Sequence, residues 1–287
     1  YHTSNYVLTT FILSFLSGDR AYEAKALKTL NYIVGIGNRV NRDVNPFICI
    51  AMCLSHSFTR DERIKKTISK YISELEVFPS INQNKKSANN FYALKALALV
   101  LRSQINESQK DINEAQDIIF NLFIHWQDED GFFYDKPFDV RSKSGTVHLT
   151  YHATMWMIMT SLAMILDDKT LKASAVKAFN ALKAVTRPTG LFSYGRSNNA
   201  SFGHSSALLA GTLQSILTDN GNGELAFRDL MFGIIDSSKS SDGHLRITPN
   251  NMEKERMGFD KYMFVSVYGA WTLSLTLLSH TIKPLQK

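Results

Sequence analysis

The amino-acid sequence predicts an all-α protein, and three observations lead to this prediction. Apolar residues recur at helical spacing through most of the 287 residues. Segments with the alternation or β-branched composition of strands are few. Short turns that pair a glycine with an aromatic or apolar residue return at intervals that hold two helices.

The periodicity predicts about eleven helices. Asp167 and Asp168 stand between two of them, and Pro188 and Gly190 end another because neither residue continues a helix cheaply. The stretch 89–97 is rich in Ala and Leu, which have high helix propensity. The helices are expected at 5–17, 21–37, 45–57, 60–76, 88–105, 110–126, 149–166, 168–186, 203–218, 223–238 and 262–281.

Two segments, 131–135 and 190–194, are predicted to form short extended pieces. A parallel sheet would need several β-branched runs that alternate with the helices, and the sequence has none. The helices therefore have to bury their apolar faces against one another.

The repeated turns predict how the helices are arranged. Gly131, Gly190 and Gly243 are 59 and 53 residues apart, and each lies in a turn before a helix. This period fits stacked helical hairpins. Long, aromatic and polar loops between the hairpins favour a closed (α/α) toroid of about five to six antiparallel helix pairs over a linear solenoid. We expect one toroid domain over residues 1–287, with the loops at one end of a central funnel.

Composition excludes several classes of protein. Apolar residues make up 44% and charged residues 20%, which is typical of a folded globular chain. A disordered tail, a collagen-like fibre and a disulfide-dense mini-protein are excluded. Lys and Arg number 32 against 26 Asp and Glu, a mild excess that favours an anionic partner. The basic residues are scattered without a stripe of interleaved aromatics, so nucleic acid is not the expected partner.

The two cysteines, Cys49 and Cys53, lie four apart in an apolar run and are predicted to be buried free thiols. A disulfide at this spacing would strain a helix. A zinc site would need further ligands, which are missing both here and around the pair His148 and His152. We expect neither a metal nor another cofactor.

No apolar run is expected to reach the roughly 18 to 20 residues that cross a bilayer. The first residues contain no basic and apolar regions of a signal peptide. Because the chain begins with Tyr1, its native start, and with it the localisation, stays open. The oligomeric state is equally open.

Two adjacent amides, Asn89 and Asn90, stand at the predicted start of a helix. Such amides cap a helix or, beside its positive end, bind a carboxylate or a sugar. Further along, His148, Tyr151 and His152 have the i, i+3, i+4 spacing that places side chains on one helix face. We interpret these three as a polar cluster that lines the funnel.

A third constellation lies between two glycines and contains Tyr194, Arg196, Asn198 and His204. Asn and Gly form turns, but an Arg in an aromatic loop is suited to hold a carboxylate bidentately. A structural role of Arg196 at helix-end carbonyls is the alternative. We expect Arg196, Asn198 and His204 to bind substrate.

The fourth constellation is the acidic segment from Trp126 to Asp135, which includes Asp128 and Asp130. Paired carboxylates serve as acid and base in glycosidases, although such pairs normally come from separate elements. A local Asp-Gly turn that closes a helix is the alternative. We expect Trp126 and Asp130 to contact substrate.

Several of these residues belong to runs that resemble the motifs of a known protein family. The runs Tyr194-Gly195-Arg196-Ser197-Asn198, His148-x-x-Tyr151-His152 and Asp260-Lys261-Tyr262 … Tyr268-Gly269-Ala270-Trp271 resemble those of heparinase II/III-like and alginate-lyase-like α/α toroids. The resemblance is greatest to the small heparinase-like proteins of glycan-assembly clusters and covers roughly residues 87 to 281. The Asn-Asn-His-x-x-Tyr motif of alginate lyases reads Asn89-Asn90-Phe91-Tyr92 here, without the His.

The resemblance implies β-elimination of a uronic-acid-containing polysaccharide. In that chemistry the C5 proton is removed after the neighbouring carboxylate has been neutralised, and the leaving glycosidic oxygen is protonated. It implies Asn89, Asn90 and Arg196 for the carboxylate, His148 or His152 as base or neutraliser, and Tyr151 or Tyr194 as acid.

Four other functions are compatible with the sequence. A glycoside hydrolase on the same toroid would use carboxylates such as Asp128, Asp130 or Asp139. A uronate epimerase would begin with the same proton abstraction as a lyase. A non-catalytic glycan-binding toroid needs no acid or base, and a prenyl-cyclising toroid ranks last because no Asp-rich diphosphate site is evident.

Overall fold

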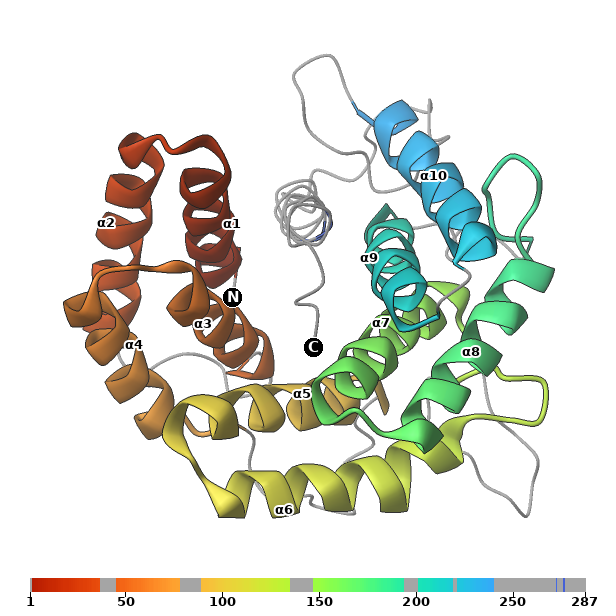
Figure 1. The fold of residues 1–287 in the computed structure, drawn as a ribbon, viewed down its shortest axis with the longest axis horizontal. Coiled ribbons are helices and arrows are strands. Elements are labelled where there is room, and N and C mark those ends of the chain that lie inside the picture. The colour runs from red at the N-terminus through yellow and green to blue at the C-terminus, as the bar shows by residue number, and fades with distance from the viewer. Residues whose placement is uncertain are drawn as a thin grey trace. The chain divides into compact units, whose positions relative to one another are not determined.

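The computed structural model (Figure 1) describes residues 2–36, 45–77, 89–134, 147–193, 201–218 and 221–239, together with Thr272 and Thr276. The chain divides into two compact units. Unit 1 comprises Tyr1–Ser87 and Phe91–Phe123, and unit 2 comprises Ala88–Asn90 and Ile124–Lys287. A single domain over the whole chain stays a prediction.

Unit 1 is built from helical hairpins. Helix α1 packs against α2 and α3, and α3 packs against α4. Helices α5 and α6 are joined by ion pairs between Lys95 and Glu114 and between Arg102 and Asp111. The elements are α1 (His2–Ser17), α2 (Arg20–Ile36), α3 (Asn45–Phe58), α4 (Glu62–Glu74), α5 (Asn89–Asn106), α6 (Gln109–Ile118) and the π-helix η3 (Ile119–Phe123).

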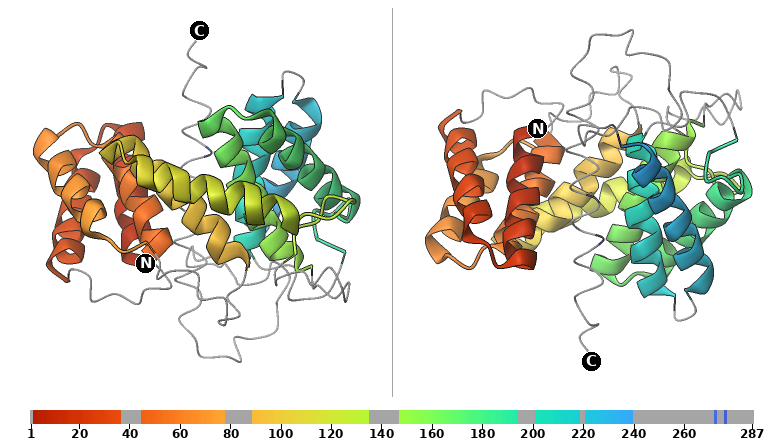
Figure 2. Two further views of the ribbon diagram at one scale, coloured as in Figure 1. Left: turned by 90° about the horizontal axis from the view of Figure 1, so that it is seen from below. Right: turned by 90° about the horizontal axis from the view of Figure 1, so that it is seen from above.

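Unit 2 continues the same pattern. Helix α7 packs against α8 and α9, and α9 packs against α10, which lies beside it in both views of Figure 2. The elements are the 3-10 helix η4 (Ile124–Trp126), α7 (Leu149–Leu166), α8 (Lys169–Ala184), α9 (Ser201–Leu217) and α10 (Asn222–Ser237). Thr272 and Thr276, within the helix predicted at 262–281, are helical and buried.

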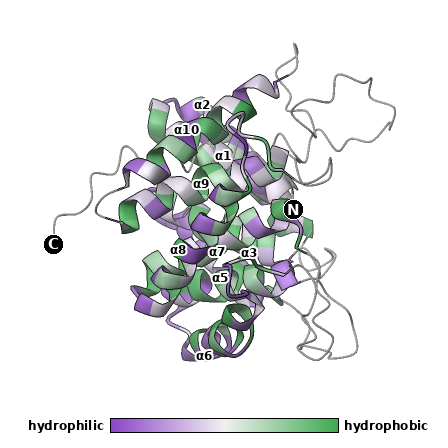
Figure 3. Cartoon of the chain, turned by 90° about the vertical axis from the view of Figure 1, so that its right-hand side faces the viewer, coloured by the Kyte–Doolittle hydropathy of each residue, from purple (hydrophilic) through white to green (hydrophobic). Residues whose placement is uncertain are grey.

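Buried and amphipathic helices alternate along the chain. Helices α3, α7 and α9 are buried over most of their length. By contrast, α4 buries one stripe that contains Ile64, Ile68 and Ile72, and α8 buries a stripe that contains Leu171 and Leu182. Figure 3 shows the same mixture of hydrophilic and hydrophobic residues on α6. Each unit therefore has a buried layer (α1, α3, α5 or α7, α9) and an outer layer.

The connections differ in length at the two ends of the buried helices. Each buried helix is followed by a short connection, at 18–19, 59–61, 107–108, 167–168 and 218–221. The connections that precede α3, α5, α7 and α9 are longer, at 37–44, 75–88, 127–148 and 185–200. These longer intervals direct attention to the N-terminal ends of the buried helices. That they form loops on one side of a funnel stays a prediction.

For the helices whose ends the structure describes, most predicted boundaries hold to within a few residues. Asp168 caps α8 by accepting a hydrogen bond from the Leu171 backbone N–H at 2.9 Å, and Asp167 before it is left-handed, with φ 50°. The expected helix 110–126 is interrupted, because α6 ends at Ile118 and is followed by the π-helix η3 (Ile119–Phe123) and the 3-10 helix η4 (Ile124–Trp126).

The two extended pieces are smaller than predicted. Each is one isolated antiparallel bridge, Gln127 with Phe133 and Thr186 with Phe192, and no longer strand occurs among the described residues. Both bridges close over a glycine in the positive-φ region, Gly131 with φ 95° or Gly190 with φ 84°, as the repeat of Gly-aromatic turns predicts. Gly243, the third glycine of the repeat, lies outside the described residues.

The expectation about apolar runs is wrong. Helix α7 has 18 residues with mean hydropathy 1.3 and is long enough and apolar enough to cross a membrane. However, 72% of this segment is buried inside the protein, as in the core helix of a helix pair. Its apolar character follows from contacts with both α8 and α9. It is the one such helix among the described residues.

The cysteines are buried free thiols, as predicted. Their Sγ atoms lie 3.9 Å apart in α3, and Cys49 contacts the Ala98 carbonyl of α5. The hydrogen bond with Cys49 and burial raise the pKa of the Cys53 thiol, so this thiol stays protonated at neutral pH.

Candidate functional site

The N-terminal ends of α7 and α9 are held unusually close to each other. A Cβ atom on Gly203 would lie 2.9 Å from the Thr150 Cα, so only glycine permits this approach. One turn further, the hydroxyl groups of Thr154 and Ser206 lie 3.2 Å apart and form a hydrogen bond across the same interface. Small and hydroxyl-bearing residues thus place the first turns of two buried helices side by side.

A cluster of three rings lies at this end of the helices, and we call it the aromatic–histidine cluster. The rings of His148 and Tyr151 have centroids 4.9 Å apart, and Tyr151 lies 5.9 Å from Phe202 of α9. All three side chains are half-buried. His148 is the N-cap residue of α7, yet its side chain makes no capping hydrogen bond. The cluster therefore offers a phenol, an imidazole and an apolar ring at one partly open surface.

His152 does not belong to this cluster, although the i, i+3, i+4 spacing predicted a common face. Its side chain is fully buried. Nδ1 accepts a hydrogen bond from the Phe133 N–H at 3.0 Å, and Nε2 lies 3.1 Å from the Ala178 carbonyl, to which it donates. Burial lowers the pKa of His152 to about 4. These contacts give His152 a structural role between a turn and α8, and they do not support its predicted part in catalysis.

His204 repeats the placement of His152 in the next helix pair. Each histidine is the fourth residue of its buried helix. Each packs on the phenylalanine of a Gly-aromatic turn, since His204 stacks on Phe192 at 4.4 Å and His152 lies 5.9 Å from Phe133. His204 is fully buried, so a direct substrate contact is not supported.

The acidic segment forms a turn that hydrogen bonds hold in place. The Asp128 carboxylate accepts a hydrogen bond from the Phe132 N–H at 2.7 Å and shapes the turn around Gly131. Gln127 binds the turn to α8, because its side-chain amide donates to the Ser174 carbonyl and accepts from the Ser174 hydroxyl. Asp130 is exposed at the tip. The local-turn interpretation thus accounts for Asp128.

Trp126 and Asn89 flank this turn. Trp126 is half-buried, and its carbonyl accepts a hydrogen bond from the Tyr134 N–H at 3.0 Å. Asn89, which belongs to unit 2, is fully buried and donates from Nδ2 to the Tyr134 carbonyl at 2.8 Å. Asn90 is 7% exposed, and its Oδ1 has no hydrogen-bond partner among the described residues. Asn89 therefore anchors the turn through its amide nitrogen, and the Oδ1 atoms of both asparagines are buried without a hydrogen-bond partner among the described residues.

Four of the predicted site residues lie outside the described residues: Tyr194, Arg196, Asn198 and the alternative carboxylate Asp139. Sequence reasoning missed Phe202 as a member of the cluster. The signal was its place directly before Gly203, at the start of a helix. Within the described part of the chain, no three His, Cys, Asp or Glu side chains are grouped so as to hold a metal ion.

Comparisons with known proteins address the fold. No protein-family model matches the sequence, and no curated protein matches it. Several solved structures do match this chain in fold. A heparin-specific unsaturated glucuronyl hydrolase has a TM-score of 0.73 at 10% identity, with 98% of this chain and 85% of that chain covered. A polysaccharide lyase has a TM-score of 0.69 at 9% identity, with 100% and 92% covered.

A third similar structure contains an oligosaccharide. It is an inactive variant of the alpha-1,6-mannanase of Salegentibacter sp. HEL1_6 in complex with alpha-1,6-mannotetrose, with a TM-score of 0.69 at 15% identity, covering 97% of this chain and 89% of that chain. The chain has the α/α toroid fold. The predicted fold class is thereby confirmed, and at these identities the likeness to other toroids concerns the fold alone.

Proposed function

We propose that the protein is a carbohydrate-active enzyme that cleaves a uronic-acid-containing glycan by β-elimination. The single observation that carries this proposal is the half-buried pair His148 and Tyr151 at the start of α7. Both side chains are groups that exchange protons in general acid–base catalysis. Support also comes from the toroid fold, which the chain shares with a polysaccharide lyase and a glucuronyl hydrolase.

The proposed reaction breaks two bonds of the glycan. A base takes the C5 proton of the uronate, and the electron pair left at C5 forms the C4–C5 double bond. The C4–O bond to the leaving sugar breaks as this double bond forms, its electron pair leaves with the oxygen, and an acid protonates that oxygen. His148 is proposed as the base or as neutraliser of the carboxylate, and Tyr151 as the acid. The C5 proton becomes acidic enough only when the carboxylate is neutralised. We propose that amides such as Asn90 do this, together with Arg196, which the sequence suggests for the same role.

The cluster is also suited to hold the sugar. Tyr151 and Phe202 present aromatic rings at a partly open surface, and such rings combine large apolar contact area with defined geometry. The start of α7 adds a positive helix end, where an anionic group is favoured. The proposed partner is therefore an anionic oligo- or polysaccharide.

Hydrolysis is the second candidate, since two of the three similar structures described above are hydrolases. The inactive mannanase variant carries replacements of two adjacent aspartates. The adjacent aspartates of this chain, Asp167 and Asp168, follow the last residue of α7. They lie about 27 Å from its start, given a rise of 1.5 Å per residue. A hydrolase would thus depend on other carboxylates, with Asp130 as the exposed one in the acidic turn.

One reaction followed in two ways tests the proposal. The protein is incubated with uronate polysaccharides and oligosaccharides while ultraviolet absorbance of unsaturated uronate and new reducing ends are measured together. β-Elimination predicts that both signals rise in equal molar amounts. Reducing ends without absorbance would indicate hydrolysis and contradict the proposed lyase. The absence of both signals over the whole panel would contradict both candidates.

A further inference from the structure

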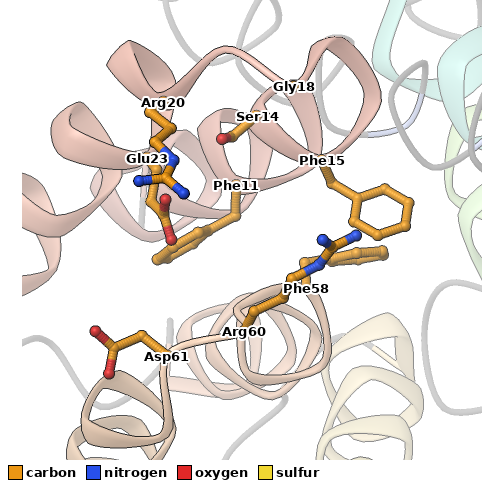
Figure 4. A pocket seen from close by; sticks show the side chains of 9 residues that line it. All are labelled: Phe11, Ser14, Phe15, Gly18, Arg20, Glu23, Phe58, Arg60 and Asp61. Carbon is orange, nitrogen blue, oxygen red and sulfur yellow. The ribbon is translucent and has the colours of Figure 1, made fainter.

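Unit 1 contains a cavity at the C-terminal ends of two buried helices. It has a volume of about 430 Å³ and opens between the α1–α2 turn and the α3–α4 connection. Its walls include Phe11, Phe15, Arg20, Glu23, Phe58 and Arg60 (Figure 4). Cavities of this size suit small organic molecules, and one sugar residue fits within it.

Aromatic rings provide the apolar part of the cavity. Phe11 is almost fully buried, whereas Phe15 leaves 45% of its surface exposed. The rings of Phe15 and Phe58 have centroids 6.0 Å apart and are tilted by 58°. An exposed phenylalanine held in place by a second ring offers a flat surface on which the C–H face of a sugar ring packs.

Two guanidinium groups stand on the walls of the cavity. Arg60 lies over the Phe15 ring, with its central carbon 5.6 Å from the ring centroid. Arg20 enters from the first turn of α2. Within the described part of the chain, neither guanidinium lies within ion-pair distance of a carboxylate. Both therefore remain able to bind an anionic oxygen in the cavity, and Arg favours a carboxylate with two oxygens.

The cavity also contains acceptors. The Glu23 carboxylate extends from α2, and Asp61 lies at the opposite wall. The Asp61 carboxylate is already bound, because it accepts hydrogen bonds from the Arg63 guanidinium and backbone N–H, which lower its pKa. Glu23 is therefore the acceptor that faces a ligand. An ionised carboxylate only accepts hydrogen bonds, and a ligand beside it needs donors. Sugar hydroxyl groups are such donors.

We propose that this cavity is a second, non-catalytic carbohydrate site, which takes one uronate residue of a glycan. A uronate sugar supplies all three matching parts: a carboxylate for a guanidinium group, Arg60 or Arg20, hydroxyl groups for Glu23, and an apolar ring face for Phe15. A neutral sugar lacks the anion, and acetate lacks the ring and the hydroxyl groups. The chemistry of the cavity carries this inference, which does not depend on any activity of unit 2.

Binding to the full chain with the Tyr151→Phe substitution tests the proposal. Methyl β-D-glucuronide is the probe, with methyl β-D-glucoside and sodium acetate as matched ligands that lack one part each. Affinity is measured by calorimetry, and hydrogen exchange with mass spectrometry locates the protected segments. We expect the glucuronide to slow exchange within 11–23 and 58–61 and to bind at least about tenfold more tightly than either matched ligand.

Substitutions then assign the site. At least one of Arg60→Gln and Arg20→Gln is expected to weaken glucuronide binding about tenfold, and Phe15→Ala to weaken it by a smaller factor. Lys70→Gln is the control, because it removes one exposed positive charge of unit 1 outside the cavity. All these side chains lie at the surface or the cavity wall, and circular dichroism checks that each variant is folded.

Three results would overturn the proposal. If the glucoside or acetate bound as tightly as the glucuronide, the carboxylate, hydroxyl groups and ring face of the sugar would not act together. Protection confined to unit 2, or no binding, would show that the cavity is not a uronate site. The assay for unsaturated uronate is independent of these outcomes, because it follows cleavage by unit 2. A protein that cleaves glycans but fails here would keep the proposed function and lose only this site.

Discussion

The imidazole of His152 accepts a hydrogen bond from the Phe133 backbone N–H at 3.0 Å, across 19 residues of chain. Its second ring nitrogen donates to the Ala178 carbonyl of α8 at 3.1 Å. One buried side chain thus joins the turn that precedes α7 to the outer helix that follows it. Such a residue holds the connection in place while its neighbours His148 and Tyr151 remain at the partly open surface.

The buried state of His152 predicts a pH dependence of stability. Its pKa is about 4 in the folded protein and about 6.5 when unfolded, so the unfolded chain binds the extra proton between these values. The free energy of unfolding should therefore fall as pH drops from 6.5 to 4, by up to about 3 kcal/mol from this group. Chemical denaturation at a series of pH values measures the effect.

The variant His152→Gln isolates this contribution, because Gln does not titrate. It should be about 2 kcal/mol less stable at pH 7, where one or both hydrogen bonds are strained or lost. The stability difference between the two proteins should shrink as pH falls and reverse its sign near pH 4, because only the parent protein loses up to about 3 kcal/mol. An unchanged difference over that range would contradict the assignment of a neutral, buried His152.

The sequence predicts the scaffold far better than the site. Helix ends follow from local signals, such as the Asp168 cap and the stop before Pro188, and these signals act within a few residues. The spacing of His148, Tyr151 and His152 predicts one helix face, but it does not tell which side chain turns into the core. His152 turns into the core because its imidazole accepts a hydrogen bond from the Phe133 backbone N–H, which lies 19 residues away in the sequence.

The sequence did not predict Phe202 as a member of the cluster, for a related reason. Its contact with Tyr151 depends on the approach of α9 to α7, which Gly203 permits against the Thr150 backbone. Neither the pairing of these helices nor their distance follows from a local pattern. The turn glycines are the opposite case, since Gly131 and Gly190 mark the repeat in the sequence and adopt positive φ in the structure.

Gly131→Ala should destabilise unit 2 by at least about 2 kcal/mol. Its φ of 95° disfavours any side chain, and the added Cβ would lie 2.4 Å from the Lys177 carbonyl oxygen. Gly233→Ala is the matched control, because beyond its own helix backbone and chain neighbours this helical glycine of α10 has no atom within 4 Å of the added Cβ. Thermal or denaturant unfolding should show the control to be equal to or more stable than the parent protein. Equal losses in both variants would refute the argument.

Asp111→Asn should destabilise unit 1 by about 3 kcal/mol. The Asp111 carboxylate accepts two hydrogen bonds of 2.7 Å from the Arg102 guanidinium, and both side chains are largely buried. Removing the charge leaves Arg102 buried without its anion, although this side chain keeps its bond to the Leu75 carbonyl. Denaturant unfolding gives the loss. Asp236→Asn breaks an exposed pair with Lys239 and should cost less than about 0.5 kcal/mol, and a similar loss in both variants would contradict this prediction.

Tyr151→Phe tests the proposed chemistry directly. The substitution removes only the phenol hydroxyl and keeps the ring that packs on His148 and Phe202. If Tyr151 protonates the leaving oxygen, kcat for release of unsaturated uronate should fall by about 10² to 10⁴, with a small change in KM.

The measurement needs two comparisons. Tyr32→Phe removes a hydroxyl from a tyrosine that is 63% exposed on α2, and its kcat should equal that of the parent protein. Phe202→Ala removes an apolar contact of Tyr151 and should raise KM, because substrate binding then lacks one ring. A Tyr151→Phe protein with full kcat would show that the proton comes from another group. The cluster would then be a sugar-binding surface, and the search for the acid would move to Asp130 and the other carboxylates.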